Sequence, residues 1–381
     1  MRVTLNRAEL SSVLNDAEKI APASSPLDSL KGALLEAEDG KLTVTASNLE
    51  VTLKRTIPCG IQEAGSTVFS AKLLAAMLRL LEGDEVFLET TANHQLLLKA
   101  GTAVYQAAAL DPANYPQTPI PFPEDTVSVT GIQSIAKRTA FAVREDNASP
   151  IMRCINLIFS SDGLRAVGSD GFRIAAAKGD SKSTGEISLL IPVTSLEKLA
   201  SLVSNQDSLQ VGTTGKYIVF TMENFAFSAR LMDGRPIDAQ AMLSAAQPRF
   251  TVLTDAAAMR SAVDSVVCVA EETARLMLRF DGQRVALQCT GENGNANGAL
   301  DVVALSGTPS GEYWYNGKQL YECLRAQNGT MMVDVAQGGV LLLRTDELIC
   351  MQTAIRKPSK QKAAPPQAEK KRKNAPLEKA A

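Results

Sequence analysis

The chain has 381 residues, of which 45% are apolar and 21% are charged, and its formal net charge is −2. This composition is typical of a folded protein of two or three domains, and no apolar run or N-terminal signal pattern predicts a membrane span or export, so we expect a cytoplasmic protein. A single histidine (His94), six cysteines without paired spacing and the lack of a phosphate-binding loop argue against an enzyme, a metal site or a cofactor.

A strand followed by a helix occurs three times along the chain. Short alternating strands at 3–5, 127–130 and 251–254 each lead into an amphipathic helix. The residues expected to cap these helices, spaced 124 residues apart, are Asn6, Thr130 and Thr254. Because the passage from strand to helix recurs at equal spacing, the sequence predicts an internal repeat.

A second helix follows in each repeat, with apolar residues at helical spacing. These helices are expected within 69–81, 191–203 and 315–326. Two alternating strands follow each helix, at 85–90 and 95–101, at 208–214 and 217–223, and at 331–337 and 340–346. The repeat predicts an α+β fold in which three tandem copies of one domain each place two helices on one face of a sheet.

The repeat also indicates where the domains begin and end. Proline-rich residues 117–126 and polar residues 244–250 separate the copies. The predicted domains are 1–120, 126–244 and 247–356. Residues 357–381 carry eight Lys and Arg against two Glu, so we expect a disordered basic tail on an acidic body. This tail is either an inert extension or a second, salt-sensitive contact with DNA or an acidic partner.

Copies of such a unit can join edge to edge into one sheet, and a dimer then closes a ring without free sheet edges. All helices lie on one side of such a ring. Each helix cation alone is more often a solvated surface residue, but together they predict a lining that attracts double-stranded DNA of any sequence. The expected DNA-facing residues are Arg7, Lys72, Arg79, Lys137, Arg138, Lys198, Arg260, Lys318 and Arg325.

Three motifs, in order inside the repeat, carry a family resemblance. Residues 164–175 (LRAVGSDGFRIA), 227–238 (FSARLMDGRPID) and 351–358 (MQTAIRKP) resemble segments of the bacterial DNA polymerase III beta subunit, the beta sliding clamp. The resemblance covers essentially residues 1–356 and implies half of a six-domain ring. It further implies a homodimer that encircles duplex DNA, tethers the replicative polymerase for processivity and performs no chemistry. The implied partners are the DNA polymerase III catalytic subunit, the clamp loader and other proteins with short clamp-binding motifs.

The resemblance also implies a pocket for such motifs between the second and third domains. Carried over residue by residue, this pocket comprises Met152, Ser169, Gly171, Phe172, Arg173, Ile174, Ile237, Met242, Met351 and Thr353. Isoleucine and methionine would supply adaptable apolar walls, Gly171 a close backbone bend, and Arg173 a donor at the rim. For Met152, Ile174 and Met351, plain core packing is the alternative.

The chain departs from the family pattern at several positions. Phe172 replaces the usual histidine, and Ile237 and Ala354 replace prolines, which predicts a more apolar pocket with an altered preference among partner motifs. Ser24 stands where the family often has a DNA-contacting arginine.

For the dimer, the resemblance implies an apolar seam between the first domain of one copy and the third domain of the other. The expected seam residues are Met77, Leu81, Tyr105, Val267 and Cys268. Core burial is the alternative for these side chains. A Leu81→Lys variant is expected to sediment as a monomer.

Two rival functions stay open from the sequence alone. An enzyme would need an acid–base or nucleophile constellation, and the motifs contain none. A divergent scaffold that binds partners without encircling DNA is compatible with the modest basic excess on the helices and with Ser24. Retention on nicked circular DNA that is lost on linearisation separates enclosure from ordinary binding.

Overall fold

The computed structural model describes residues 1–91, 93–118, 120–182, 186–270 and 274–357. These residues form three successive blocks that repeat one order of elements, nine strands and two helices in each block. The first block comprises β1 (Arg2–Asn6), α1 (Arg7–Ile20), β2 (Ala33–Glu38), β3 (Lys41–Ser47), β4 (Val51–Pro58), β5 (Gly60–Glu63), β6 (Gly65–Phe69), α2 (Ala71–Arg79), β7 (Glu85–Thr90), β8 (Gln95–Ala100) and β9 (Ala103–Ala108).

The second and third blocks follow the same order. The second comprises β10 (Val127–Val129), α3 (Ile132–Thr139), β11 (Cys154–Ser160), β12 (Gly163–Ser169), β13 (Arg173–Gly179), β14 (Ser181–Lys182), β15 (Ile187–Pro192), α4 (Val193–Leu202), β16 (Leu209–Thr213), β17 (Tyr217–Met222) and β18 (Phe225–Arg230). The third comprises β19 (Pro248–Asp255), α6 (Ala256–Val267), β20 (Arg275–Asp281), β21 (Arg284–Gly291), β22 (Gly294–Asp301), β23 (Val303–Ser306), β24 (Ser310–Asn316), α7 (Gly317–Arg325), β25 (Thr330–Ala336), β26 (Leu341–Arg344) and β27 (Leu348–Gln352). A further helix, α5 (Ala239–Ala245), lies in the connection between these two blocks.

The first helix shows why the repeat folds as its pattern predicts. Asn6 has an extended backbone, and its side-chain oxygen accepts hydrogen bonds from the backbone N–H groups of Ala8 and Glu9 at 2.9 and 3.1 Å, which confirms the predicted cap. The buried residues of α1 recur at helical spacing: Leu10, Val13, Leu14, Ala17 and Ile20. Burial of one large aliphatic side chain contributes roughly 1.5–3 kcal/mol, so the apolar face holds the helix on the sheet more than the cap does.

The predicted caps of the corresponding helices are wrong by one residue. α3 begins after Gly131, which has a φ of 74°, and not after Thr130. Thr254 still belongs to strand β19, so the cap of α6 is Asp255, whose carboxylate accepts the backbone N–H of Ala258 at 2.9 Å. Strand β19 runs through Thr254, whereas β10 ends at Val129, before Thr130, so the one-residue shift has no common cause in the two blocks.

The blocks are joined edge to edge through continuous sheets. β4 pairs antiparallel with β18, with Leu53 opposite Phe227, and this pairing joins the first two blocks in a nine-stranded sheet. β13 pairs antiparallel with β27, with Ala175 opposite Cys350, and joins the second and third blocks in the same way. The expectation that one sheet continues across the border between two copies is confirmed at both borders.

The paired strands hold the same places in the repeat at both junctions. β4 and β13 are each the fifth element of their block, and β18 and β27 are each the last. Their remaining equivalents are β22 in the third block and β9 in the first. Within the described residues, each of these two is an edge strand of its sheet. The row of three blocks therefore ends in two unpaired edge strands, β9 and β22. They are equivalent to the two strands that pair at each internal junction.

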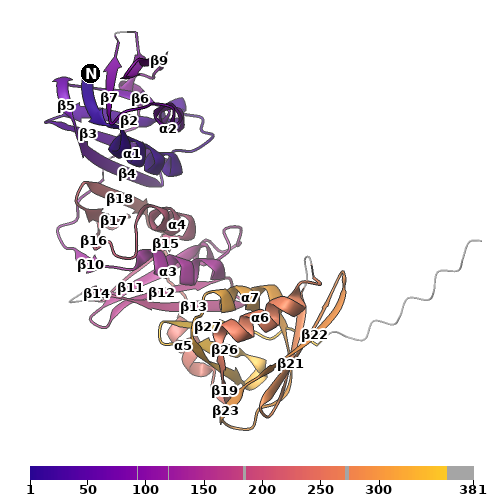
Figure 1. Ribbon diagram of the computed structural model, residues 1–381. Coiled ribbons are helices and arrows are strands. Elements are labelled where there is room, and N and C mark those ends of the chain that lie inside the picture. The colour runs from indigo at the N-terminus through magenta and orange to yellow at the C-terminus, as the bar shows by residue number, and fades with distance from the viewer. Residues whose placement is uncertain (92, 119, 183–185, 271–273, 358–381) are drawn as a thin grey trace, which may run out of the picture.

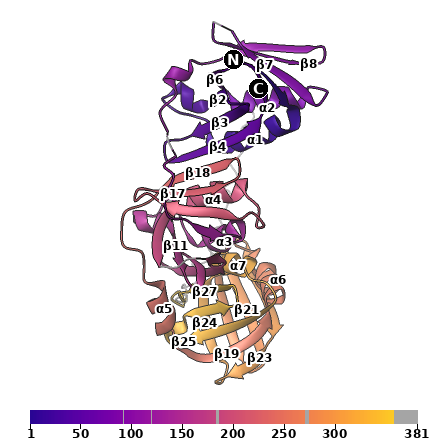
Figure 2. The ribbon, with the colours of Figure 1, turned by 90° about the vertical axis from the view of Figure 1, so that its left-hand side faces the viewer.

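The three blocks follow a curve, and the two helices of every block lie toward its concave side (Figure 1). The strands form the convex side. Helix α5 is the exception, because it lies on the side of the third block away from α6 and α7 in both views (Figure 2). The fold class predicted from the repeat, α+β with tandem copies, is confirmed. The predicted domain boundaries stay a prediction, and the predicted tail lies outside the described residues except for Lys357.

Candidate functional site

The turn between β12 and β13 is held by its own side chains. The Ser169 hydroxyl donates to the carbonyl of Arg173 at 2.7 Å and accepts the N–H of Gly171 at 3.1 Å. The Asp170 carboxylate accepts the backbone N–H groups of Phe172 and Arg173 at 2.9 and 3.0 Å. Gly171 has a φ of 92°, which favours glycine. This locked turn holds Phe172 in solvent, with 64% of the residue exposed.

Arg173 does not lie at the rim of a pocket, which corrects the prediction. Side chains alternate along β13, so Arg173 and Ile174 point to opposite faces of the sheet. Arg173 is 5% exposed; its Nε donates to the Asp170 carboxylate at 3.0 Å, and Nη1 donates to the carboxylate of Glu322 on α7. Nη2 donates to the carbonyl of Phe141. The guanidinium therefore ties the turn to the helical layer of the next block.

Ile174 and Met351 form the floor of the opposite, outer face. They are 2% and 6% exposed and belong to a small apolar cluster beneath α5. Ala239 of α5 is buried in the same cluster, and Ile237 packs against its edge. Met242, on the same helix, is 49% exposed. The alternative of core packing therefore holds for Ile174 and Met351 in the chain alone, whereas Met242 and Phe172 remain at the surface.

Met152 and Thr353 complete the surroundings of the turn. The backbone N–H and the hydroxyl of Thr353 both donate to the carbonyl of Phe172, at 2.9 and 3.0 Å. A Cβ at Gly171 would lie 3.7 Å from the Met152 sulfur, so this side chain rests against the turn. A cavity of about 10 Å³ remains between Met152, Ser169 and Ile237, too small for an apolar side chain unless the methionine moves. The unbranched thioether side chain of methionine suits such a movement.

The nine cations predicted to face DNA lie on six helices: α1, α2, α3, α4, α6 and α7. All six helices lie toward the concave side (Figure 1). Lys72, Arg79, Lys137, Lys318 and Arg325 are exposed, and Arg260 is half-buried.

Two of the nine cations have a structural contact instead of a free side chain, and a third is half-buried. The Nε of Arg7 donates to the carbonyl of Gly83 at 2.6 Å, and Arg138 forms an ion pair with Glu347. Burial lowers the pKa of Lys198, although the charge of Glu50 opposes this shift. Because contacts or burial within the chain engage these three cations, they contribute less to a DNA-facing lining than their charge suggests.

Two of the five predicted seam residues lie in the core of the chain itself. Leu81 and Val267 are 4% and 8% exposed, so core burial, the alternative, holds for both. Met77 and Tyr105 are half-buried, and Cys268 is exposed at the end of α6. A Leu81→Lys variant would therefore disturb folding before it tested any seam.

Sequence reasoning missed the apolar residue that caps the end of α2 and is the more exposed of two leucines at the surface there, Leu73 being 44% exposed. Leu80 is 74% exposed, although its neighbour Leu81 is buried. Leu73, Met77 and Leu80 follow a spacing of four and then three residues, which places them on one helix face. This second apolar stripe, beside the buried one, is the signal that could have identified Leu80.

Family models match the first two blocks. The model for the DNA polymerase III beta subunit, N-terminal domain, matches residues 1–119, and the model for the central domain matches residues 126–236. Together they cover more than half of the chain. The chain belongs to the DNA polymerase III beta subunit family.

Curated relatives agree with this assignment. Proteins named beta sliding clamp from Staphylococcus epidermidis and Staphylococcus aureus are 26% identical over 246 residues. The match covers 61% of this chain and 65% of each relative, slightly less than two thirds of the relatives' length.

Solved structures share the fold of the whole chain. The DNA polymerase sliding clamp from Bacillus subtilis superposes with a TM-score of 0.88 at 18% identity, covering 94% of this chain and 100% of that one. The DNA polymerase III subunit beta from Pseudomonas aeruginosa gives 0.85 at 20% identity, covering 93% and 100%. The third block therefore has the same fold as the corresponding part of these family structures.

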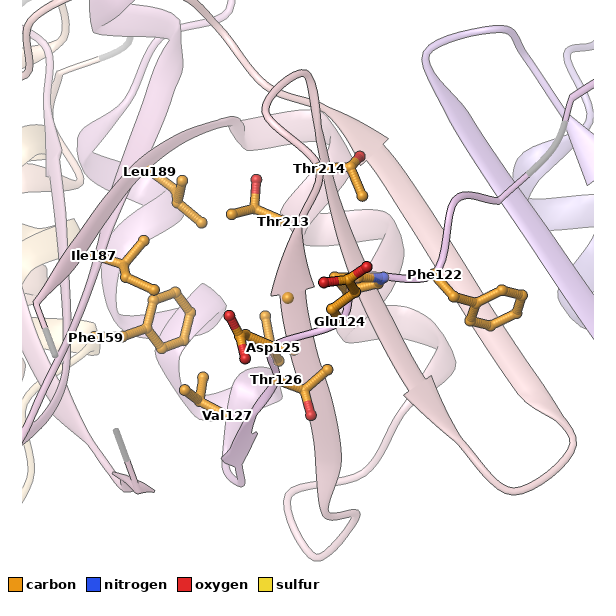
Figure 3. Close-up of a pocket in the computed structure, with 13 residues that line it drawn as sticks. Phe122, Glu124, Asp125, Thr126, Val127, Phe159, Ile187, Leu189, Thr213 and Thr214 are labelled. Carbon is orange, nitrogen blue, oxygen red and sulfur yellow. The ribbon is translucent and has the colours of Figure 1, made fainter. Parts of the chain in front are cut away.

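A separate cavity of about 770 Å³ lies in the second block, between residues 122–127 and strands β11, β15 and β16. Figure 3 shows Phe159, Ile187 and Leu189 on one side of it and Thr213 on the other. Phe122 points away from these side chains. The cavity lies on a different part of the second block from the turn 169–173.

Among the described residues, no group of three His, Cys, Asp or Glu side chains is arranged to hold a metal ion. Helices of the length and apolar character needed to span a bilayer are likewise missing from the described parts of the chain.

Proposed function

We propose that two copies of this chain form a ring that encircles double-stranded DNA and acts as a sliding clamp. The observation that carries this proposal is the pair of open edges, because β22 and β9 are the equivalents of the strands that pair at both internal junctions. Pairing β22 of each copy with β9 of the other closes the row and leaves neither of these two edges unpaired. The ring then contains six domains, with 1–120, 126–244 and 247–356 in each copy.

The side chains near the open edges support this seam. Leu80 lies at the end of α2 in the first block, and Cys268 lies at the end of α6 in the third. At the first internal junction, the equivalent helices α4 and α1 meet at their ends, where the Lys19 ammonium donates to the carbonyl of Ser201 at 2.8 Å. By the same geometry, Leu80 of one copy meets the region of Cys268 of the other.

The concave helical face is the proposed DNA-facing surface. Exposed Lys and Arg side chains on these helices attract phosphates without reading bases. Such contacts are weak enough to exchange as the duplex moves. Enclosure and not tight binding then tethers the replicative polymerase, and the clamp itself makes and breaks no bond.

The outer face at the second junction is the proposed docking site for partners. Phe172 and Met242 are exposed apolar side chains that suit the apolar side chains of a short linear motif, whereas Ile174 and Met351 are buried in the cluster beneath α5. The proposed partners are the DNA polymerase III catalytic subunit, the clamp loader and other proteins that carry clamp-binding motifs. Movement of Met152 would open the small cavity beside the turn.

Retention on circular DNA tests enclosure. A bacterial clamp loader and ATP would load the labelled protein onto nicked circular duplex, followed by gel filtration in high salt, which weakens direct phosphate contacts. We expect the protein to stay on the circle and to leave once a restriction enzyme linearises it. Equal retention on both forms would favour a scaffold that binds DNA or partners without encircling DNA.

A further inference from the structure

One sheet of the third block ends in an exposed apolar strand. Among the described residues, β23 pairs only with β19 and is therefore an edge strand. All four of its residues are exposed, Val303 by 58% and Leu305 by 51%. Figure 1 and Figure 2 both show β23 at the end of the third block that lies away from the second block. An edge strand presents unpaired backbone N–H and C=O groups to any extended chain that approaches it.

The equivalent edge strands of the other two blocks are better protected. β5 follows β4, and β14 follows β13, as β23 follows β22. β14 has only two residues. β5 ends in Glu63, whose carboxylate lies 3.8 Å from the Arg2 guanidinium on the neighbouring strand β1. Short length and charged side chains keep other chains from pairing with an edge. β23 is longer than β14 and, unlike β5, contains no charged residue, so it is the least protected of the three.

Closure of a dimer through β22 would leave β23 open. At the two internal junctions, β4 and β13 pair with the following block. β5 and β14 nevertheless stay edge strands within the described residues. By the same geometry, β22 can pair with another copy while β23 stays accessible. A partner on β23 therefore does not compete with the proposed ring, and binding to β23 does not require the ring to close.

An acidic groove of about 860 Å³ begins at the first residue of β23. Val303 lines it together with residues at the ends of β19, β20, β21 and β22. Three exposed carboxylates, those of Asp255, Asp281 and Asp301, face one guanidinium, that of Arg284, in this lining. None of the three forms an ion pair with a described residue. Asp255 is engaged as the cap of α6, which leaves Asp281 and Asp301 available to a cation.

We propose that β23 and the acidic groove bind an extended, basic segment of a partner protein, which adds to the sheet as a further strand. Backbone hydrogen bonds to β23 hold the segment, and its alternate side chains select it. Apolar side chains of the segment cover Val303 and Leu305, which are otherwise in solvent. A Lys or Arg of the segment enters the groove toward Asp281 and Asp301, because opposite charges complement each other there.

Binding of a defined peptide to the full chain tests this site. The probe is a short fluorescent peptide of alternating valine and lysine, and its affinity is measured by anisotropy. Leu305→Lys is expected to weaken binding about tenfold or more, because a charge on the edge repels the basic strand and removes an apolar contact. The double variant Asp281→Asn and Asp301→Asn is expected to weaken binding about tenfold at low salt and less at high salt.

Two matched variants serve as controls. The pairing register shifts by one residue in β5 and in β23, and the extra residues are Gln62 and Leu305. Gln62→Lys therefore places the same charge at the equivalent edge position. The double variant Glu36→Gln and Glu38→Gln removes two exposed carboxylates from β2. We expect both controls to bind the probe as wild type does. Losses equal to those of the β23 and groove variants would mean diffuse attraction and would overturn the site.

Modified probes test the mode of binding. A peptide with glutamate in place of lysine is expected not to bind, and equal affinity for both peptides would refute a basic partner. A valine–lysine peptide with methylated backbone nitrogens cannot donate hydrogen bonds to β23 and is also expected not to bind. Unchanged affinity of the methylated peptide would refute strand addition. If wild-type protein bound none of these peptides, the site itself would be refuted.

Two other occupants of β23 would give different results, and we expect neither. If deletion of residues 358–381 raised the affinity for the probe about tenfold, the chain's own basic tail would be the occupant. If Leu305→Lys abolished assemblies larger than a dimer in sedimentation velocity, the occupant would be another copy. Either result would overturn the assignment to a partner protein.

Folding and ring closure are checked separately. Leu305, Asp281 and Asp301 are exposed, so their variants are expected to unfold at the wild-type temperature. Leu305→Lys is also expected to stay on nicked circular DNA as wild type does. Loss of probe binding with normal retention is the expected result, whereas normal probe binding by Leu305→Lys would contradict the role of β23 whatever happened on DNA.

Discussion

The two junctions inside the chain use the same strand pairing but different side-chain contacts. At the first junction, Lys19 donates to the carbonyl of Ser201, and Arg55 lies 5.7 Å from the centre of the Phe225 ring. At the second, the buried Arg173 guanidinium joins Asp170 of its own turn to Glu322 of the next block. The first junction is therefore held by the sheet and by partly exposed cations, whereas the second also contains an ion pair with side chains 6% and 0% exposed.

This difference coincides with the location of the proposed docking site. The exposed Phe172 lies one residue before Arg173, whose buried guanidinium points to the helical side. The comparison teaches that the same strand pairing only joins two blocks at one border, whereas at the other it also supports the proposed docking site.

Removal of the buried guanidinium tests that difference with the largest expected effect. Arg173→Ala leaves the Asp170 carboxylate buried, with its side chain 0% exposed and without its cation, and loss of one partner of a buried pair costs about 3–5 kcal/mol. Lys19→Ala at the first junction removes a side chain that is 43% exposed and should cost no more than about 1 kcal/mol. Urea denaturation would measure both. Similar losses would mean that the two junctions do not differ in this way.

The open edge of the first block offers a matched pair of neighbouring leucines. Leu81→Ala creates a cavity in the core and should lower the free energy of unfolding by about 2–5 kcal/mol. Leu80→Ala, at a residue 74% exposed, should change it by no more than about 0.5 kcal/mol. Thermal or chemical unfolding of the two variants side by side measures the difference, and a stability loss at Leu80 equal to that at Leu81 would contradict the assigned faces of α2.

Charge at the same exposed position tests whether the open edges meet in a dimer. Leu80→Lys is expected to leave the fold intact but to raise the dimer dissociation constant about tenfold or more, because a lysine is desolvated at the seam. Sedimentation velocity over a range of concentrations would show this shift. Lys41→Ala, on an exposed part of β3, is the control. A dimer of unchanged strength would place the seam elsewhere.

Truncation of the exposed aromatic at the second junction gives the smallest expected effect. Phe172→Ala should weaken binding of a clamp-binding peptide by about tenfold, as expected when a central aromatic contact is removed. Stability should stay unchanged, since the ring is mostly in solvent. Phe122→Ala, at another exposed phenylalanine, serves as the control. Fluorescence anisotropy with the labelled peptide would measure both variants, and equal peptide affinity for Phe172→Ala and wild type would remove Phe172 from the docking site.

The sequence by itself determined the two helices of each copy, most strands and the threefold repeat, but not α5. These follow from local periodicities of 3.6 and 2 residues, from capping residues such as Asn6 and from the equal spacing of the copies. The same patterns indicated that sheets continue between copies. They also drew attention to the turn 169–173, because a glycine turn beside an aromatic residue is visible in the sequence alone.

Only the tertiary structure decided which side chains share a face or a cavity. Arg173 meets Glu322 across 149 positions of sequence, and its pairing turns a predicted rim residue into a buried link. The tertiary structure likewise separated Leu80 from Leu81 and gathered Lys137, Arg260 and Arg325 around one pocket. Local sequence patterns carry no information about such contacts. The contacts depend on how elements distant in the sequence pack, and on which charged side chains become buried next to one another.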